Sequence, residues 1–511
     1  MIPTSISTAI SYPNAKPHLG HALEFVQADF LARYYRLQGS EVFFQTGLDE
    51  HGQKIYRTAA EAGMEPHAFV EQQQHLFRGL LEALNIKPDR FIRTTDTDHR
   101  EMSQAMWKKC FDAGDIYKKT YRAWYNVKEE EFLASADDVK DSSTFGVDMK
   151  FIELIEEENY FFRLSKYYDK LVNVLESKAY EVVPSNRSHE VLNFIKGGLQ
   201  DVSISRQKDK LPWGIPVPGD DSQVMYVWFD ALTNYLTGTA TLNGDTIVPN
   251  QFWPYSLHCV GKDIARFHAV MWPAMLLSAG LELPHQLLVH GFILSDGRKM
   301  SKSIGNVVDP HEAISVAGTD ATRWYLLAEI PTLDDGDFTL ERLRAVYASD
   351  LANDFGNVVS RVVAMCKKYC EGGVPQVASE QVENLEKTLI SEAWQQYHAH
   401  IMERQIDKAL EVVKGMVVFC NRRIEEQKPW AMAKEVSRKA ELEELLYELI
   451  EMIRHVSVML LPAMPNTIEH LHSTVFSGIP DEVCHSVEWG KTPPGLKLPE
   501  EGIILFPRLE S

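Results

Sequence analysis

Short apolar runs alternate with segments of helical period over about the first 110 residues. Residues 5–10 and 41–46 are short and rich in apolar or β-branched side chains, whereas residues 22–38 space their apolar side chains three and four apart. Strands that alternate with helices in this way form βαβ units, whose strands are parallel. The pattern therefore predicts a parallel sheet near the N-terminus.

The pattern changes between about residues 117 and 217, where charged and aromatic residues dominate and the segment ends in the turn-forming residues 213–219. Short apolar runs return at residues 224–229, 257–260 and 287–294, which indicates that the sheet resumes there. We therefore predict an α/β, Rossmann-like parallel sheet that is split by an α+β insertion.

Helical spacing continues almost throughout the chain beyond residue 350. Apolar side chains between Leu442 and Val456 fall on one face with a period near 3.6, and Pro462 and Pro465 are expected to end that helix. Residues 502–506 have a strand-like pattern. The C-terminal part is therefore predicted to be a separate α-helical bundle with a short strand at its end.

Composition and charge narrow the classes of function. The chain has 511 residues, of which 45% are hydrophobic and 24% charged, as in globular proteins that fold around several cores. Its 52 basic and 72 acidic residues give a net charge of −20, which disfavours indiscriminate binding to nucleic acid. A nucleic-acid partner must therefore contact a local basic or aromatic patch.

No segment is suited to a membrane or to secretion. The N-terminal residues lack the features of a signal peptide, and the most apolar window, residues 269–281, is short and contains Pro273. Six scattered cysteines fit a reducing compartment, so a cytoplasmic location is expected. Cys366 and Cys370 lie one helical turn apart in an apolar stretch, which favours core packing over a metal pair.

The sequence His18-Leu-Gly-His21 lies where a predicted strand gives way to a helix. Two histidines at a helix start lie beside free backbone N–H groups, which together attract an anion such as phosphate. Gly20 leaves room for a ligand to approach the backbone. A zinc protease would need histidines four apart with a glutamate, which this segment lacks. On these residues alone, ordinary surface or core histidines remain an alternative to phosphate binding.

The segment Ser295-Asp-Gly-Arg-Lys-Met-Ser-Lys-Ser-Ile-Gly305 is a loop of small residues that carries Arg298, Lys299 and Lys302. Lysines on such a loop can neutralise charge that develops on a polyphosphate during nucleotidyl transfer. A solvated basic turn is the alternative for this segment when it is considered by itself.

Taken together, the two segments resemble the two signatures of class I aminoacyl-tRNA synthetases. Further segments resemble methionyl-tRNA synthetases, and the resemblance extends from about residue 3 to residue 510. These segments are Ala9-Ile-Ser-Tyr-Pro-Asn14, Thr46-Gly-Leu-Asp-Glu-His-Gly52, Glu156-Glu-Glu-Asn-Tyr-Phe-Phe-Arg163, Tyr226-Val-Trp-Phe-Asp-Ala231, Gly261-Lys-Asp-Ile264 and Lys428-Pro-Trp430.

This resemblance implies a two-step reaction, in which methionine and ATP with Mg²⁺ form methionyl-adenylate and the methionyl group is then moved to tRNA(Met). The residues it assigns to catalysis are His18, His21, Lys299 and Lys302. It assigns Tyr12, Asn14, Gly20 and Asp263 to ATP, together with the catalytic four, and Ile10, Tyr12, Asp49, Trp228, Tyr235 and His268 to methionine. Asn357, Arg361 and Trp430 match residues that read the anticodon.

Some features depart from the broader family pattern. Many methionyl-tRNA synthetases hold zinc in the insertion through paired cysteines, but no cysteine occurs here between Cys110 and Cys259, so we expect no structural zinc. The chain also has no room after the bundle for the tRNA-binding domain that makes some members dimers, so a monomer is expected. In these respects the chain resembles the short, zinc-free type of this family that is known from bacteria and organelles.

The expected domains follow from these boundaries. They are residues 1–113 and 219–293 for the two halves of the Rossmann-like catalytic domain, 114–218 for the connective insertion, 294–350 for the lysine loop and stem-contact region, and 351–511 for the helical anticodon-binding domain. A synthetase for isoleucine, valine or leucine would need a much larger insertion. A small-molecule nucleotidyltransferase would not need the bundle, and a non-catalytic tRNA-binding relative would not need His18, His21 and Lys302.

Overall fold

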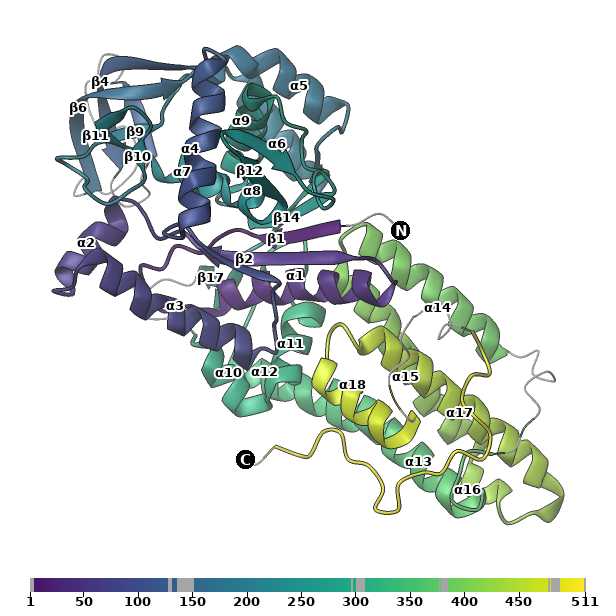
Figure 1. Cartoon of the computed structure of the whole chain (residues 1–511). Helices are drawn as coiled ribbons and strands as arrows, with labels where there is room; N and C mark the ends of the chain where they lie inside the picture. Colours follow the sequence, from purple (N-terminus) through teal and green to yellow (C-terminus); the bar gives the residue numbers. More distant parts are fainter. Residues whose placement is uncertain are drawn as a thin grey trace.

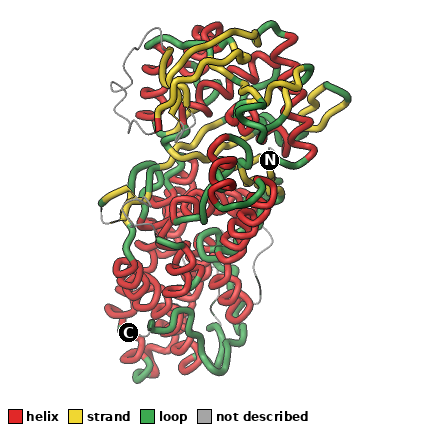
Figure 2. The backbone as a smooth tube through the Cα atoms, turned by 90° about the vertical axis from the view of Figure 1, so that its left-hand side faces the viewer, coloured by secondary structure: helices red, strands yellow, loops and turns green. Residues whose placement is uncertain are grey.

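The structure, a computed structural model, describes residues 4–126, 131–135, 151–295, 297–299, 308–375, 377, 385–476, 478 and 488–509. Its strands gather at one end of an elongated molecule and its long C-terminal helices at the other, as Figures 1 and 2 show from two directions. The predicted combination of a strand-containing part and a helical bundle is therefore confirmed.

A six-stranded sheet lies at the centre of the N-terminal part, and every pairing within it is parallel. Across the sheet, its strands are β3 (Arg90–Arg93), β2 (Val42–Leu48), β1 (Thr4–Thr8), β14 (Ser256–Gly261), β15 (Gln286–His290) and β7 (Glu181–Val183). The order of connection reverses between β1 and β14. In a doubly wound sheet, such a reversal opens a crevice at the carboxyl ends of the strands, where ligands bind.

Helices cover both faces of this sheet. In β15, Leu288 belongs to a hydrophobic core that includes α1 (Leu19–Leu37), whereas Leu287 and Val289 belong to a second core that includes α4 (Thr97–Asp112). Successive side chains of a strand point to opposite faces, so both faces must be apolar when both are covered. Figure 1 shows α1 and α4 on opposite sides of β1 and β2.

Shorter elements complete the N-terminal part. Its other helices are α2 (Gln53–Glu61), α3 (Pro66–Ala83), α7 (Val227–Leu232), α8 (Asn234–Thr239), α9 (Trp272–Ala279), α10 (Pro310–Ala317), α11 (Thr319–Trp324) and α12 (Leu340–Val346), with π-helical turns at Phe267–Met271, Tyr325–Glu329 and Tyr347–Gly356. Two small sheets contain β12 (Ala240–Asn243) with β13 (Thr246–Pro249), and β17 (Arg298–Lys299), β16 (Ile293–Ser295) and β18 (Gly336–Asp337).

Two further sheets are formed mostly by the predicted insertion, residues 114–218, although β11 (Asp220–Met225) lies just beyond its expected end. They are β5 (Glu131–Ser135), β4 (Ile116–Asn126), β6 (Ile152–Phe162) and β8 (Val202–Ser203) in one, and β10 (Pro216–Val217), β11 and β9 (Ser205–Gln207) in the other. They are accompanied by α5 (Tyr168–Glu176), α6 (Ser185–Lys196) and a 3₁₀ turn at Leu164–Tyr167. Strand β7 falls within the expected range 114–218 but pairs with β15 of the parallel sheet.

The apolar run at residues 224–229 was expected to resume the parallel sheet, and this is wrong. Its first residues end β11, which is antiparallel to its neighbours, and the following residues form α7. The end of β11 and most of α7 are buried, and a short buried helix has the same continuous apolar pattern as a buried strand. Residues 257–260 and 287–290 do lie in parallel strands of this sheet, as predicted, but residues 291–294 of the second run do not: they leave the sheet, and Ile293 begins β16 of a separate small sheet.

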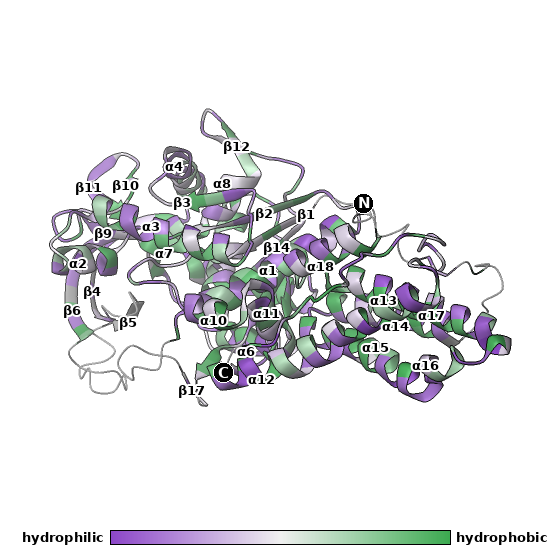
Figure 3. Ribbon diagram, turned by 90° about the horizontal axis from the view of Figure 1, so that it is seen from below, coloured by the Kyte–Doolittle hydropathy of each residue, from purple (hydrophilic) through white to green (hydrophobic). Residues whose placement is uncertain are grey.

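The C-terminal part is a bundle of helices. They are α13 (Asn357–Tyr369), α14 (Leu385–Met402), α15 (Ile406–Gln427), α16 (Pro429–Met432), α17 (Lys439–Leu460) and α18 (Pro465–Leu471), with a 3₁₀ turn at Val436–Arg438 and a π-helical turn at His472–Phe476. The helix predicted around residues 442–456 is confirmed by α17. Figure 3 shows hydrophobic and hydrophilic bands on these helices, the pattern of amphipathic helices whose apolar sides pack together.

The C-terminal segment runs back along the bundle and is held by one buried carboxylate. Glu451, on α17, accepts hydrogen bonds from the backbone N–H groups of Gly490, Lys491 and Thr492, and pairs with Arg454. Burial alone would raise the pKa of Glu451, but the hydrogen bonds and charges of His455 and Arg454 hold it below its usual value. The strand predicted at residues 502–506 is wrong, because this segment follows the bundle as a loop with Ile503 buried.

A fully buried arginine joins the two parts. Arg323, on α11, donates hydrogen bonds to the carbonyl oxygens of Leu84 at 3.0 Å, Pro462 at 2.8 Å and Ala463 at 2.9 Å. Its guanidinium also pairs with Asp29 of α1 at 2.7 Å. These partners come from α1, the end of α3 and the corner between α17 and α18. One side chain therefore ties the sheet-covering helices to the bundle.

Candidate active site

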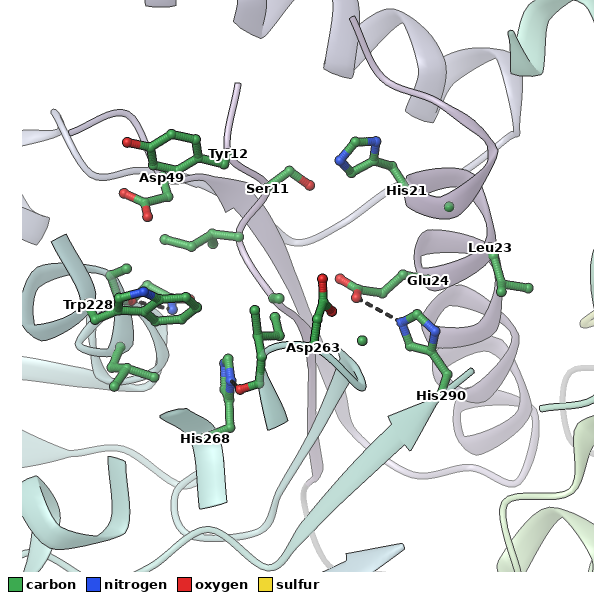
Figure 4. A pocket seen from close by; sticks show the side chains of 18 of the residues that line it. Ser11, Tyr12, His21, Leu23, Glu24, Asp49, Trp228, Asp263, His268 and His290 are labelled. Carbon is green, nitrogen blue, oxygen red and sulfur yellow. Dashed lines mark hydrogen bonds and ion pairs between the residues drawn. The ribbon is translucent and has the colours of Figure 1, made fainter. Parts of the chain in front are cut away.

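A cavity of about 390 Å³ opens at the carboxyl ends of β1, β2, β14 and β15. Its lining includes residues 9–12 after β1, Asp49 after β2, Gly261 at the end of β14 with Asp263 and Ile264 after it, and His290 at the end of β15 with residues 291–293 after it, together with the start of α1. Figure 4 shows side chains from these segments turned toward a common space. The cavity thus lies where the strand order reverses, as the topology predicts for a ligand site.

The two histidines of the first motif form the cap of α1. His18 Nδ1 accepts a hydrogen bond from the Gly20 N–H at 3.0 Å, and His21 Nδ1 accepts one from the His18 N–H at 3.1 Å. A neutral imidazole whose Nδ1 accepts carries its hydrogen on Nε2. Burial, with the charge of His18, lowers the pKa of His21 well below its usual value, so its ring is neutral. Both rings line the cavity as N–H donors.

Gly20 has a further role that the sequence did not indicate. A Cβ at this position would lie 2.9 Å from Cε1 of His18, closer than real carbon contacts. The glycine is therefore needed for the His18 ring to fold back onto the start of the helix. This requirement adds to the predicted role of leaving space for a ligand.

One turn further along α1, Glu24 pairs with His290 at the end of β15. Glu24 Oε2 lies 2.9 Å from His290 Nε2, and both side chains are nearly enclosed. Burial raises the pKa of Glu24; burial alone would lower the pKa of His290, but the hydrogen bond and charge of Glu24 raise it. The pair lies beside Asp263 in the cavity (Figure 4). Sequence reasoning missed it, although Glu24 follows His21 at helical spacing.

Aromatic rings form the opposite end of the cavity. Trp228 stacks on Phe267 with ring centroids 3.8 Å apart and planes 4° from parallel. The Tyr235 hydroxyl lies 2.7 Å from His268 Nε2, and His268 Nδ1 donates to the carbonyl oxygen of Ile264 at 3.0 Å. Burial lowers the pKa of His268 to about 4, so the ring stays neutral and Tyr235 is the donor. This end suits an apolar, polarisable side chain.

A carboxylate lies beside these rings. Asp49 is buried in the cavity wall after β2, near Tyr12 (Figure 4). The Tyr12 hydroxyl donates to the backbone carbonyl of His51 at 2.9 Å, which fixes the ring. Ile10 also lines the cavity. A carboxylate within an aromatic and aliphatic wall can hold an ammonium group next to an apolar chain.

Some predicted residues do not line this cavity. Asn14 lies in the turn that leads into α1, outside the cavity lining. Lys299 belongs to β17, but its side chain is not described, and Lys302 lies outside the described residues. Strand β17 pairs with β16, which continues directly from the cavity residues 290–293. The backbone that leads to the lysine segment therefore starts at the cavity.

The three predicted anticodon residues lie at the far end of the bundle. Asn357 and Arg361 are on α13, and the Arg361 guanidinium lies 5.9 Å from the ring centroid of Trp430 on α16. Arg361 also pairs with Glu425 at 2.6 Å. The Trp430 side chain is 39% exposed, unusual for so large an apolar group. Figure 1 shows α16 distant from β1 and β14.

The part of the chain that the structure describes contains neither a metal-binding cluster nor a membrane-spanning helix. Within it, no group of three or more histidine, cysteine, aspartate or glutamate side chains could hold a metal ion. The expectation of no zinc continues to rest on the sequence, because residues 127–130 and 136–150 of the insertion are not described. No described helix combines the length and apolar character needed to cross a membrane.

Known proteins resemble the chain over its whole length. A family profile described as tRNA synthetases class I (M) matches residues 4–142 and 135–363. A methionine–tRNA ligase of Rhizobium meliloti (strain 1021) is 42% identical over 99% of this chain and 98% of its own, and one of Clostridium acetobutylicum is 41% identical over 99% and 78%. The solved Mycobacterium tuberculosis methionyl-tRNA synthetase in complex with methionyl-adenylate is 38% identical, with a TM-score of 0.92 over 99% of this chain and 100% of its own.

Proposed function

Because this chain belongs to the methionyl-tRNA synthetase family of class I enzymes, we propose that the cavity between β1 and β14 is where it joins methionine to ATP. The enzyme is a methionine–tRNA ligase: it forms methionyl-adenylate and pyrophosphate, and then transfers methionine to the 3′ end of tRNA(Met). One observation carries the assignment of the site. Two N–H donors at the start of α1 and a carboxylate within an aromatic wall line the same cavity.

In this proposal methionine lies between Asp49 and the aromatic end. Asp49 holds the ammonium group, while Trp228, Tyr235, His268 and Ile10 surround the thioether. Sulfur–aromatic contacts contribute about 0.3–1.5 kcal/mol each. Neutral His268 adds no charge to this end, because Tyr235 donates to its Nε2. The methionine carboxylate is thereby left facing the start of α1, where the α-phosphate is held.

Catalysis of the first step relies on position and electrostatics. The methionine carboxylate attacks the α-phosphorus, and the negative charge that grows on the phosphoryl oxygens is met by the Nε2–H groups of His18 and His21 and by the N-terminus of α1. Donors that are fixed beforehand need no rearrangement during the reaction. We propose that Tyr12, Asn14, Gly20 and Asp263 position the nucleotide.

The departing pyrophosphate is assigned to the lysine segment. We propose that Lys299 and Lys302 neutralise it and that Mg²⁺ arrives with the triphosphate. The imidazole of His290 contacts the Glu24 carboxyl group beside Asp263 and offsets part of the negative charge there. That arrangement limits repulsion of an approaching anion.

We propose that Trp430 stacks on an anticodon base while Asn357 and Arg361 contact base edges. The enzyme is further proposed to be a cytoplasmic monomer, with domain boundaries at about residues 113, 218, 293 and 350. Sedimentation at micromolar concentration tests the monomer, because a dimer would sediment as twice the mass of 58.2 kDa.

Amino-acid-dependent ATP–pyrophosphate exchange tests the function as a whole. Methionine should support exchange, and an amino acid that differs from it by one group should support it about 5- to 150-fold less, because each missing or added group in such a pocket is worth about 1–3 kcal/mol. A protein that exchanges with another amino acid, or with none, would contradict the proposal. Charging of tRNA(Met) transcripts then tests the second step.

A further inference from the structure

Two motif segments contact each other through side chains that do not line the cavity. Asp230, on α7, comes two residues after Trp228, and His51 comes two residues after Asp49. Asp230 Oδ2 lies 2.6 Å from His51 Nδ1, and its other oxygen lies 2.7 Å from His99 Nε2. The Asp230 side chain is fully buried.

A buried carboxylate is stable as an anion only when its oxygens receive strong hydrogen bonds. Asp230 meets this condition: burial would raise its pKa, but the charges and hydrogen bonds of His51 and His99 keep the pKa below its usual value. His99 is itself held by the Thr237 hydroxyl at 2.9 Å, on α8. The carboxylate therefore joins α4, α7, α8 and the loop after β2 at one point.

Further contacts, besides the one with Asp230, hold the loop after β2. The carbonyl of His51 accepts from the Tyr12 hydroxyl at 2.9 Å, and the carbonyl of Glu50 accepts from Trp213 Nε1 at 2.6 Å. The Glu50 carboxylate pairs with Arg93 at 2.7 Å. His51 is thus held through its ring by Asp230 and through its backbone by Tyr12. The backbone N–H of Asp49 donates to the carbonyl oxygen of Ser11 at 2.9 Å, so the residue between these anchors is also held.

We propose that Asp230 is a positioning residue for the amino acid: it sets the distance between Asp49, which holds the ammonium group, and Trp228, which forms the side-chain wall. This inference rests on the proposed function, because it assigns those two residues to methionine. Asp230 touches neither substrate. It fixes the distance between Asp49 and Trp228. The site recognises its amino acid partly by this distance, because it must match the distance from the ammonium group to the thioether.

The first test is Asp230→Asn in methionine-dependent ATP–pyrophosphate exchange. The amide of asparagine has the same shape as the carboxylate but no charge. Its NH₂ group would face the N–H of one of the two histidines, and because two donors repel each other, the loop after β2 should shift. The KM for methionine should rise about tenfold or more, while kcat and the KM for ATP change less than about threefold. Equal changes in all three constants, or an unchanged KM for methionine, would overturn the proposal.

Asp115→Asn is the matched control. Asp115 is also a buried carboxylate, but its partners are Lys166, Tyr167 and Ser278, away from the cavity. This variant should lower the thermal unfolding temperature and leave the KM for methionine unchanged. If it raises that KM as much as Asp230→Asn does, loss of a buried charge anywhere has the effect, and the assignment to Asp230 is refuted.

A pair of variants at His51 keeps the test valid if Asp230→Asn does not fold. The amide nitrogen of His51→Asn can take the place of Nδ1 and donate to Asp230, whereas His51→Ala cannot. The KM for methionine should rise about tenfold in His51→Ala and recover to within about threefold in His51→Asn. No recovery would refute the proposal. Absence of methionine-dependent exchange in the unaltered protein would instead refute the function itself.

Discussion

Gly20→Ala separates the chemistry of the site from the stability of the fold. The new Cβ would lie 2.9 Å from Cε1 and 3.0 Å from Nδ1 of His18. Carbon atoms pack best at about 3.5–4.0 Å, so the ring must retreat by about 0.5–1 Å. That movement breaks the hydrogen bond from the residue 20 N–H to Nδ1 and leaves the tautomer of His18 unfixed.

Two effects on stability nearly cancel. Alanine is favoured over glycine within a helix by about 1 kcal/mol, whereas loss of a helix cap costs about 0.5–2 kcal/mol. The free energy of unfolding should therefore change by about 1 kcal/mol or less. Activity has no such compensation, because a misplacement of about 1 Å can cost about 10²-fold in rate. We expect kcat to fall about 10- to 100-fold, or about 1.4–2.7 kcal/mol of transition-state stabilisation.

The assay is ATP–pyrophosphate exchange at saturating methionine and ATP, with thermal unfolding measured on the same preparations. Gly415→Ala is the control, because this glycine lies within α15 and an added Cβ would meet nothing within 4 Å. The control should keep its full kcat and gain slightly in stability. If Gly20→Ala retains kcat within about twofold, or loses it only by unfolding, the capped geometry of His18 is not what catalysis requires.

Three more changes test other parts of the structure. Trp430→Ala should reduce tRNA charging about 5- to 150-fold, the loss of one base stack of about 1–3 kcal/mol, and leave exchange unchanged; equal losses in both assays would make the tryptophan structural. His268 has a pKa of about 4 when folded and about 6.5 when unfolded, so the unfolded state binds more protons between these values and stability falls as the pH drops through them. His268→Gln should lose this dependence, so the stability difference between the two proteins should shrink by about 2 kcal/mol from pH 7.5 to pH 5, and a constant difference would be contrary to the reasoning. Glu451→Gln should cost about 3–5 kcal/mol and expose residues 488–509 to proteolysis, since Arg454 and three backbone N–H groups lose their common anion. Cleavage no faster than in the unaltered protein would show that other contacts hold the segment.

The sequence supports prediction where local pattern determines structure. Helix α17 and the strands β14 and β15 follow from periodicity, because their side chains meet the same environment along their whole length. The run at residues 224–229 misleads, since burial alone does not distinguish a helix from a strand. The tail at residues 502–506 misleads for a different reason: Ile503, Leu505 and Phe506 pack against the core without pairing as a strand, and Ile504 is exposed.

The candidate site likewise contains residues that the sequence predicts and residue pairs that it does not. His18 and His21 could be predicted because the cap they form is local. The pairs of Glu24 with His290 and of His51 with Asp230 could not, because their partners are 266 and 179 residues apart and no periodicity connects them. Strand β7 was placed in the insertion for the same reason: only its pairing with β15 reveals its sheet.

The buried guanidinium of Arg323 has a consequence for how the protein can be divided. A fragment that ends near residue 350 would keep Arg323 and Asp29 but lose the carbonyl oxygens of Pro462 and Ala463. Water would then have to replace these two carbonyl acceptors, and the apolar surface that the bundle covers would be exposed. The catalytic part and the bundle should consequently melt in one cooperative transition, and neither should be obtained as a stable piece by itself.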